Sequence, residues 1–137
     1  VLLDRAHASM DARCEMLLFM ASRAQLAHER IAPAVARGEL VIADRFVASA
    51  LVYQGLAGGL PERDIEAAAG LAIGPLRPDV YVVLDADDAT LVRRLASKAA
   101  ANELAGGPAA RGGADRIEAR GAAFRALVRS GYQRLCE

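Results

Sequence analysis

The chain of 137 residues carries 17 basic and 17 acidic side chains, so its formal net charge is zero. This balance gives no electrostatic reason to expect a nucleic-acid-binding or membrane-binding surface, and no apolar run reaches the roughly 18 residues that a membrane helix needs. The two cysteines, Cys14 and Cys136, are too few for a disulfide framework, and His7 and His28 have no partner at metal-ligand spacing.

The first predicted element is a helix that begins after Ser9 or Asp11, either of which can cap it, and that ends near Ala36. Pro33 lies late in this helix and is expected to bend or restart it. Apolar side chains recur every three or four residues and form one stripe: Met10, Cys14, Leu17 or Leu18, Ala21 and Ala24.

Phe19 and Arg23 share a second face of this helix, because they stand four residues apart. A flat aromatic ring and a planar guanidinium on one patch could stack a nucleotide base and donate to its carbonyl. The alternative is a phenylalanine in the core and an arginine that extends to solvent. From these residues alone, the alternative is favoured.

Residues 40–43, LVIA, form a short apolar run that predicts a buried parallel strand. Asp44 and Arg45 follow where that strand would end, and ligands bind beyond the carboxyl ends of such strands. The carboxylate could hold a hydrated metal or orient a reacting group. The arginine could bind a phosphate through two parallel hydrogen bonds.

A helix is expected after this strand, with Ser49 and Tyr53 on one face and Gln54 beside them. An alternative is that Asp44 simply pairs with Arg45 while Tyr53 packs in the core. Taken alone, the stretch supports the two interpretations about equally.

A proline opens a further predicted helix over residues 61–73. Residues 80–84, VYVVL, again predict a buried parallel strand that ends in a carboxylate, Asp85. Asp87 or Asp88 is expected to cap the next helix. Asp85 and Asp87 could hold a metal, but capping and solvation of the strand end are the favoured roles.

Residues 99–114 are rich in alanine and glycine and contain Arg111. Such a stretch could be a disordered linker or a mobile lid that closes over phosphates. Its position between two predicted helices favours the lid. The last helix is expected over residues 115–135, with four side chains turned inward: Ile117, Phe124, Val128 and Leu135.

Four blocks together resemble a bacterial thymidylate kinase: EMLLFMASRAQ at 15–25, DRFVASALVYQG at 44–55, RPDVYVVLDAD at 77–87 and ADRIEARGAAF at 114–124. They occur in that family's order and at compatible spacings. The resemblance implies an α/β protein with the three-layer P-loop nucleoside-monophosphate-kinase-like fold and its parallel sheet. It also implies that the full-length protein is a cytoplasmic enzyme and a homodimer. Its substrates would be small molecules, and it would bind neither nucleic acid nor a membrane.

The activity that the resemblance implies is transfer of the γ-phosphoryl group of ATP to dTMP, forming dTDP for dTTP synthesis, with Mg²⁺ bridging the phosphates. In the dTMP site, Phe19 would stack on the base and Arg23 would contact its carbonyl. Tyr53 would crowd the 2′ position of the sugar, and Ser49 and Gln54 would support the base and sugar pocket.

The catalytic residues that the resemblance implies lie after the first predicted strand and in the lid. Arg45 would hold the acceptor phosphate, and Asp44 would position the acceptor or, through water, the magnesium ion. Two arginines, Arg111 and Arg116, are candidates to reach the transferring phosphoryl group.

A nucleotide kinase of this class needs the phosphate loop G-x-x-x-x-G-K-[ST], and this chain has none, since its sole lysine, Lys98, is followed by Ala99. We therefore expect one partial domain over residues 1–137, with its lid at about 99–114. It would be an internal fragment without the N-terminal phosphate loop or the C-terminal strand, and inactive alone. The alternatives are another nucleotide or deoxynucleoside kinase of this fold, or a catalytically dead nucleotide-binding module.

In the family's sheet, the strand that leads into the phosphate loop lies between the strands that match residues 40–43 and 80–84. If that arrangement is retained, these two strands should run parallel about 9 to 10 Å apart, with no ladder between them.

Overall fold

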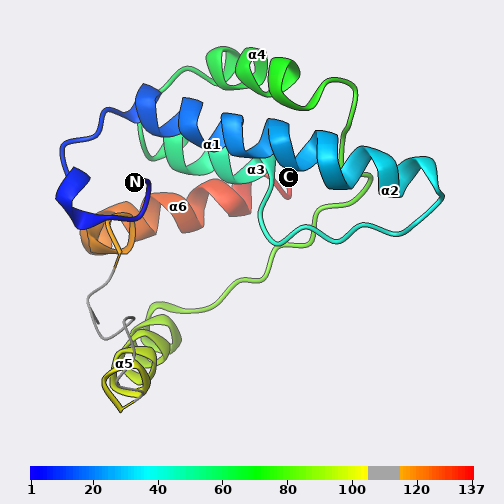
Figure 1. Ribbon diagram of the computed structural model, residues 1–137. Helices are drawn as coiled ribbons and strands as arrows, with labels where there is room; N and C mark the ends of the chain where they lie inside the picture. Colours follow the sequence, from blue (N-terminus) through cyan, green and yellow to red (C-terminus); the bar gives the residue numbers. More distant parts are fainter. Residues whose placement is uncertain (105–114) are drawn as a thin grey trace.

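The computed structural model describes residues 1–104 and 115–137, and every regular element in these residues is helical. Figure 1 shows a long N-terminal helix in the middle of a layer of helices. This helix comprises α1 (Ala12–Leu26), a π-helical turn η2 (Ala27–Ile31) and α2 (Ala32–Ala36), which confirms the predicted helix. Asp11 caps it, since its carboxylate accepts from the Arg13 N–H at 2.8 Å.

The π-helical turn lies directly before Pro33, which has no N–H to donate to the carbonyl four residues earlier. The chain accommodates this gap by widening one turn, so that the Ala32 N–H bonds to the Ala27 carbonyl. Pro33 was expected to bend or restart the helix, and the structure shows a π-helical turn before it, after which α-helix resumes at Ala32.

Two further helices complete the core with α1. The segment α3 (Val47–Ala50) runs on as a π-helical segment η3 (Leu51–Leu56), and α4 (Glu62–Ile73) follows Pro61 as predicted. The segment η3 contacts α1, α4 and α6. The largest apolar cluster joins α1, α3 and α4 through five buried side chains: Met16, Met20, Ala50, Ile65 and Ala69.

The C-terminal helix α6 (Gly121–Arg134) packs on η3, after a short 3₁₀ turn η5 (Glu118–Arg120). Gly121, the first residue of α6, has a positive φ of 85°, which interrupts the helical path, so the helix predicted from residue 115 begins later. Near the N-terminus lies the short 3₁₀ helix η1 (Arg5–His7).

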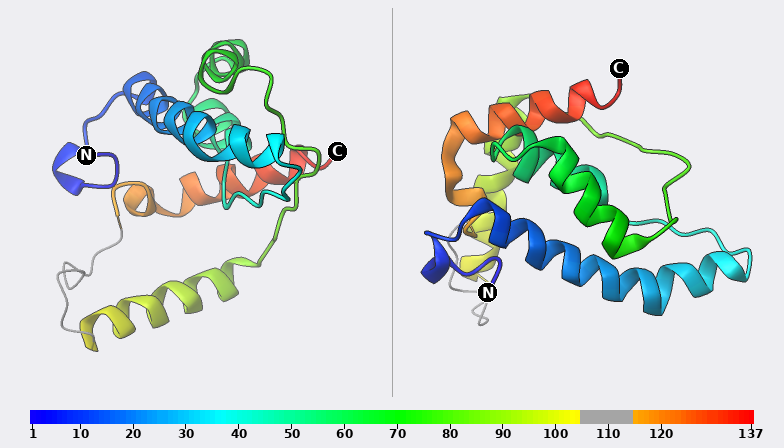
Figure 2. Two further views of the ribbon diagram at one scale, coloured as in Figure 1. Left: turned by 45° about the vertical axis from the view of Figure 1, so that its right-hand side comes forward. Right: turned by 90° about the horizontal axis from the view of Figure 1, so that it is seen from above.

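Helix α5 (Asp88–Leu104) stands apart from the helical layer in Figure 1 and in the left view of Figure 2. The Asp87 carboxylate accepts from the Thr90 N–H at 2.6 Å, as expected for the residue that caps this helix.

The two predicted strands, and with them the predicted parallel sheet, are not formed in the described residues. Residues 40–43 and 80–84 are irregular segments, and no backbone hydrogen bond joins one to the other. Their apolar side chains face solvent, with Ile42 87% and Val82 80% exposed. The reason is physical: a strand exists only when a neighbour satisfies its N–H and C=O groups, and the described residues supply no such neighbour.

Along residues 1–104 and 115–137, no helix combines the length and the apolar character needed to cross a membrane.

Candidate functional site

Two patches that the sequence singled out lie on adjoining elements. On α1, the guanidinium of Arg23 lies 5.5 Å from the centre of the Phe19 ring, within cation–π range. Both side chains are half-buried. Placement of the two residues on one face is therefore observed, and the flat patch remains partly open to solvent.

Arg45 lies where the extended segment turns into α3, and its backbone is strained. Its φ of 70° is left-handed, and it is the one non-glycine residue with positive φ among the described residues. Such strain costs of the order of 1 to 3 kcal/mol and concentrates at functional sites. The conformation directs the guanidinium over the Tyr53 ring, 5.1 Å from its centre.

Aromatic rings from η3 and α6 form the wall behind Arg45. Tyr53 makes edge-to-face contacts with Phe124 at 6.0 Å and with Tyr132 at 6.4 Å between ring centres. The Tyr132 hydroxyl is hydrogen-bonded to the Ser49 hydroxyl, with 2.7 Å between the oxygens. Ser49 is buried, so this bond holds α6 against α3.

Tyr132 influences both patches, because its hydroxyl group, when ionised, raises the pKa of Arg23 and of Arg45. Burial lowers the pKa of Arg23. Burial also acts to lower the pKa of Arg45, but the hydrogen bond and charge interaction with Tyr53, together with the charges of Tyr132 and Asp44, outweigh it and raise that pKa. The ordinary pKa of arginine is so far above 7 that the guanidinium groups of Arg23 and Arg45 both stay protonated at neutral pH. The two patches therefore present two cations and four aromatic rings, a combination suited to an anionic ligand with a planar ring.

A charged network lies under this wall. The Gln54 amide donates to the Glu15 Oε1 at 2.6 Å, and the guanidinium groups of Arg116 and Arg120 both donate to the Glu15 Oε2. The side chains of Glu15, Gln54 and Arg116 are buried. Gln54, predicted to support the base and sugar, thus turns toward Glu15.

The remaining predicted residues lie at the edge of this site or outside the described residues. Asp44 is exposed beside Arg45, and the charge of its carboxylate contributes to the raised pKa of that arginine. Arg111 falls outside the described residues. Asp85 pairs with Arg129 through two hydrogen bonds of 2.7 and 2.9 Å. Among the described residues, no three acidic, histidine or cysteine side chains gather as a metal-binding group.

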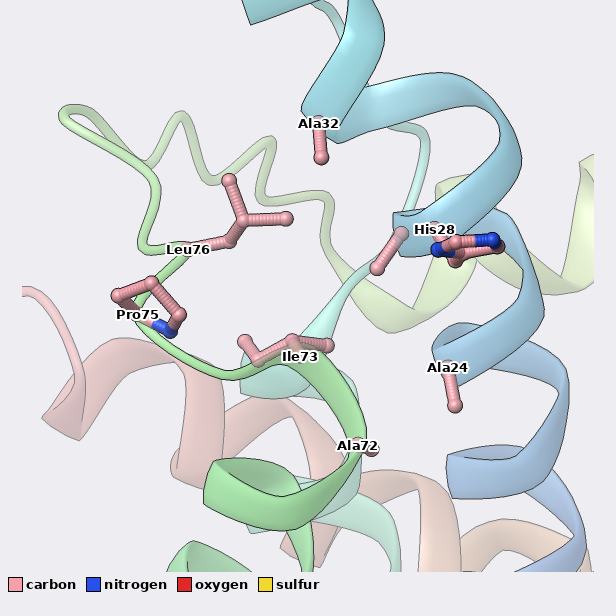
Figure 3. A pocket seen from close by; sticks show the side chains of 8 residues that line it. Ala24, His28, Ala32, Ala72, Ile73, Pro75 and Leu76 are labelled. Carbon is pink, nitrogen blue, oxygen red and sulfur yellow. The ribbon is translucent and has the colours of Figure 1, made fainter.

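A separate hollow of about 260 Å³ lies between the end of α1 and the end of α4 (Figure 3). Its lining is almost wholly apolar, with His28 at its rim: Ala24, Ala27, His28, Ala32, Ala72, Ile73, Pro75 and Leu76. It has no charged or hydrogen-bonding set to fix a nucleotide, unlike the patches around Tyr132.

Glu15 and Tyr132 are the site residues that sequence reasoning missed. Tyr132 stands four residues after Val128 and eight after Phe124, both predicted to face inward, so helical spacing could have placed it on the same face. Glu15 had a weaker signal, an acidic side chain directly before the buried Met16.

The comparisons with known proteins agree on one family. The family model described as thymidylate kinase matches residues 1–136. The thymidylate kinase of Symbiobacterium thermophilum is 42% identical over 133 residues, which cover 96% of this chain and 55% of that protein. The thymidylate kinase of Lactobacillus delbrueckii is 38% identical over 135 residues, covering 98% of this chain and 58% of that protein. The chain thus spans little more than half the length of these relatives, and it belongs to the thymidylate kinase family.

Proposed function

We propose that the chain carries the acceptor-nucleotide site of a thymidylate kinase, which transfers the γ-phosphoryl group of ATP to dTMP and forms dTDP. Family membership supports the reaction. The observation that carries the site is that Arg45 lies over the Tyr53 ring on η3, while Arg23 lies over the Phe19 ring on α1, which contacts η3. One patch suits a base and the other a phosphate.

At the base, Phe19 stacks on thymine and Arg23 donates to a ring carbonyl. The half-buried position of Arg23 supports this role, since a hydrogen bond from a partly desolvated cation discriminates more strongly than one in water. Tyr53 crowds the 2′ position of the sugar and so selects a deoxynucleotide. Ser49 supports the pocket through Tyr132, and Gln54 through Glu15.

At the phosphate, Arg45 binds the acceptor group with its planar fork. The Tyr53 ring behind it limits the orientations of the guanidinium, so less freedom is lost on binding. Asp44 holds Mg²⁺ through water, and a bound magnesium ion would neutralise charge on the phosphates. Arg111 is the proposed catalytic arginine of the lid. Arg116, the second candidate, is buried and ion-paired to Glu15, so it would have to leave that ion pair to reach the phosphoryl group.

By analogy with the family, the whole protein would have the parallel sheet of the P-loop kinase fold and would use ATP as donor. It would be a homodimer in the cytoplasm. The P-loop motif that would bind ATP is not part of these 137 residues.

Two preparations test the activity: the full-length protein that contains this chain, and the 137 residues alone. With dTMP and Mg-ATP in a coupled assay of ADP release, the full-length protein should turn over and the 137 residues should not. Absence of dTMP-dependent ADP release from the full-length protein would reject the kinase assignment. Turnover of dCMP or a deoxynucleoside in preference to dTMP would favour another kinase of the fold.

A further inference from the structure

Glu15 is a fully buried carboxylate that binds three side chains from separate parts of the chain. It lies on α1, one turn before Phe19. Its partners are Gln54 on η3, Arg116 before η5, and Arg120 at the end of η5. The charge of Glu15 therefore links α1, which carries Phe19 and Arg23, to η3, which carries Tyr53, and to the segment that leads into α6.

Two chains of contact lead from Glu15 to Tyr53. In the first, Gln54 is the residue next to Tyr53, and its amide is held by the carboxylate at 2.6 Å. In the second, the guanidinium of Arg120 lies 4.7 Å from the centre of the Phe124 ring, and Phe124 meets Tyr53 edge to face. Both end at the ring over which Arg45 lies.

Because Glu15, Gln54 and Arg116 are buried, water cannot replace the hydrogen bonds between them. Arg116 is held further by the carbonyl of Leu2, to which its Nε donates at 2.9 Å. One carboxylate balances two guanidiniums, so loss of its charge would leave two cations unpaired beneath the aromatic wall. Arg120 has a side chain that is 24% exposed, so without the charge of Glu15 it could move toward water. The cation–π contact between Arg120 and Phe124 would then be lost.

We propose that Glu15 is a positioning residue of the dTMP site: it holds Gln54 and Arg120 so that Tyr53 and Phe124 present a fixed wall to the sugar and to Arg45. The inference rests on the proposed function. It assigns to a buried ion pair a role in acceptor binding, beyond a contribution to folding.

The first test is Glu15→Gln in the full-length protein, which keeps the side-chain size and removes the charge. We expect the KM for dTMP to rise by at least about tenfold while the KM for ATP stays within about twofold. A purely structural role would lower the active fraction, and therefore kcat, without this selective change in KM.

The second test is Arg120→Lys, which retains the charge but not the planar fork, and which decides the question if Glu15→Gln does not fold. Its KM for dTMP should rise by at least about threefold. Arg134→Lys, at the exposed end of α6, is the matched control and should leave both KM values unchanged. Folded variants at positions 15 and 120 with an unchanged KM for dTMP would overturn the inference alone. An inactive unaltered protein would instead overturn the proposed function, and this inference with it.

Discussion

Arg45 combines backbone strain with a cation held over an aromatic ring. If it binds the acceptor phosphate, Arg45→Ala in the full-length protein should lower kcat/KM for dTMP by an amount equal to at least about 2 kcal/mol of transition-state stabilisation. Steady-state kinetics at varied dTMP measures this. Arg63→Ala removes a guanidinium whose side chain is 86% exposed and should change little. An equal loss in both variants would contradict the role given to Arg45.

Arg23 is the residue that we expect to choose the base. Arg23→Ala removes the donor to the thymine carbonyl but leaves Phe19, whose stacking does not depend on the identity of the base. The ratio of kcat/KM for dTMP to that for dCMP should therefore fall, because binding of dTMP loses more than binding of dCMP. An unchanged ratio would mean that Arg23 does not contact thymine.

At the scale of elements, the close packing of α6 on η3 depends on Gly131. A Cβ atom there would lie 2.9 Å from Val52 Cγ1, and Val52 is buried and β-branched, so it cannot easily move away. Gly131→Ala should lower the free energy of unfolding by about 1 to 3 kcal/mol.

The matched control is Gly70→Ala in α4, where a Cβ atom would meet nothing within 4 Å. It should raise the free energy of unfolding by about 0.4 to 1 kcal/mol, since alanine restricts the unfolded chain. Urea titrations of both variants provide the comparison. Equal effects would show that α6 does not depend on this close approach.

The segment after residue 84 is tied to α6 by Asp85. The bidentate hydrogen bond from Arg129 lowers the pKa of Asp85 from 3.8 to about 2. A carboxyl group whose pKa is lowered in the folded state stabilises that state above its ordinary pKa, and the contribution is lost as the pH falls from about 4 to about 2. The free energy of unfolding measured across this range should fall less steeply for Asp85→Asn. Parallel curves for the two proteins would contradict the assignment.

For the whole molecule, the two irregular segments expose apolar side chains and unpaired backbone groups, which favour association between chains. The 137 residues alone should therefore self-associate, as measured by size-exclusion chromatography with light scattering. Ile42→Lys together with Val82→Lys should reduce this, because edge lysines oppose strand pairing. Leu71→Lys, at an equally exposed site on α4, should not. A monomer at all concentrations would contradict this prediction.

The sequence alone determined the helices, their caps and the family. Asp11 and Asp87, each one of two predicted candidates, cap α1 and α5, and Pro61 indicated the start of α4, because these residues act on the few positions that follow them. The helix at α1 is confirmed, but the apolar stripe expected on it is not its buried face: Cys14 and Leu17 are exposed, whereas Met16 and Met20 are buried. The four sequence blocks were sufficient to indicate thymidylate kinase, which the family comparison confirmed.

Only the tertiary structure decided which side chains meet. Glu15 and Arg116 pair across 101 positions, and Ser49 and Tyr132 across 83, and no local spacing encodes such contacts. The predicted strands are not formed in the described residues for the same reason. An apolar run at residues 40–43 or 80–84 indicates that a segment suits a sheet, but a ladder forms only when a neighbouring strand supplies the other half of each hydrogen bond.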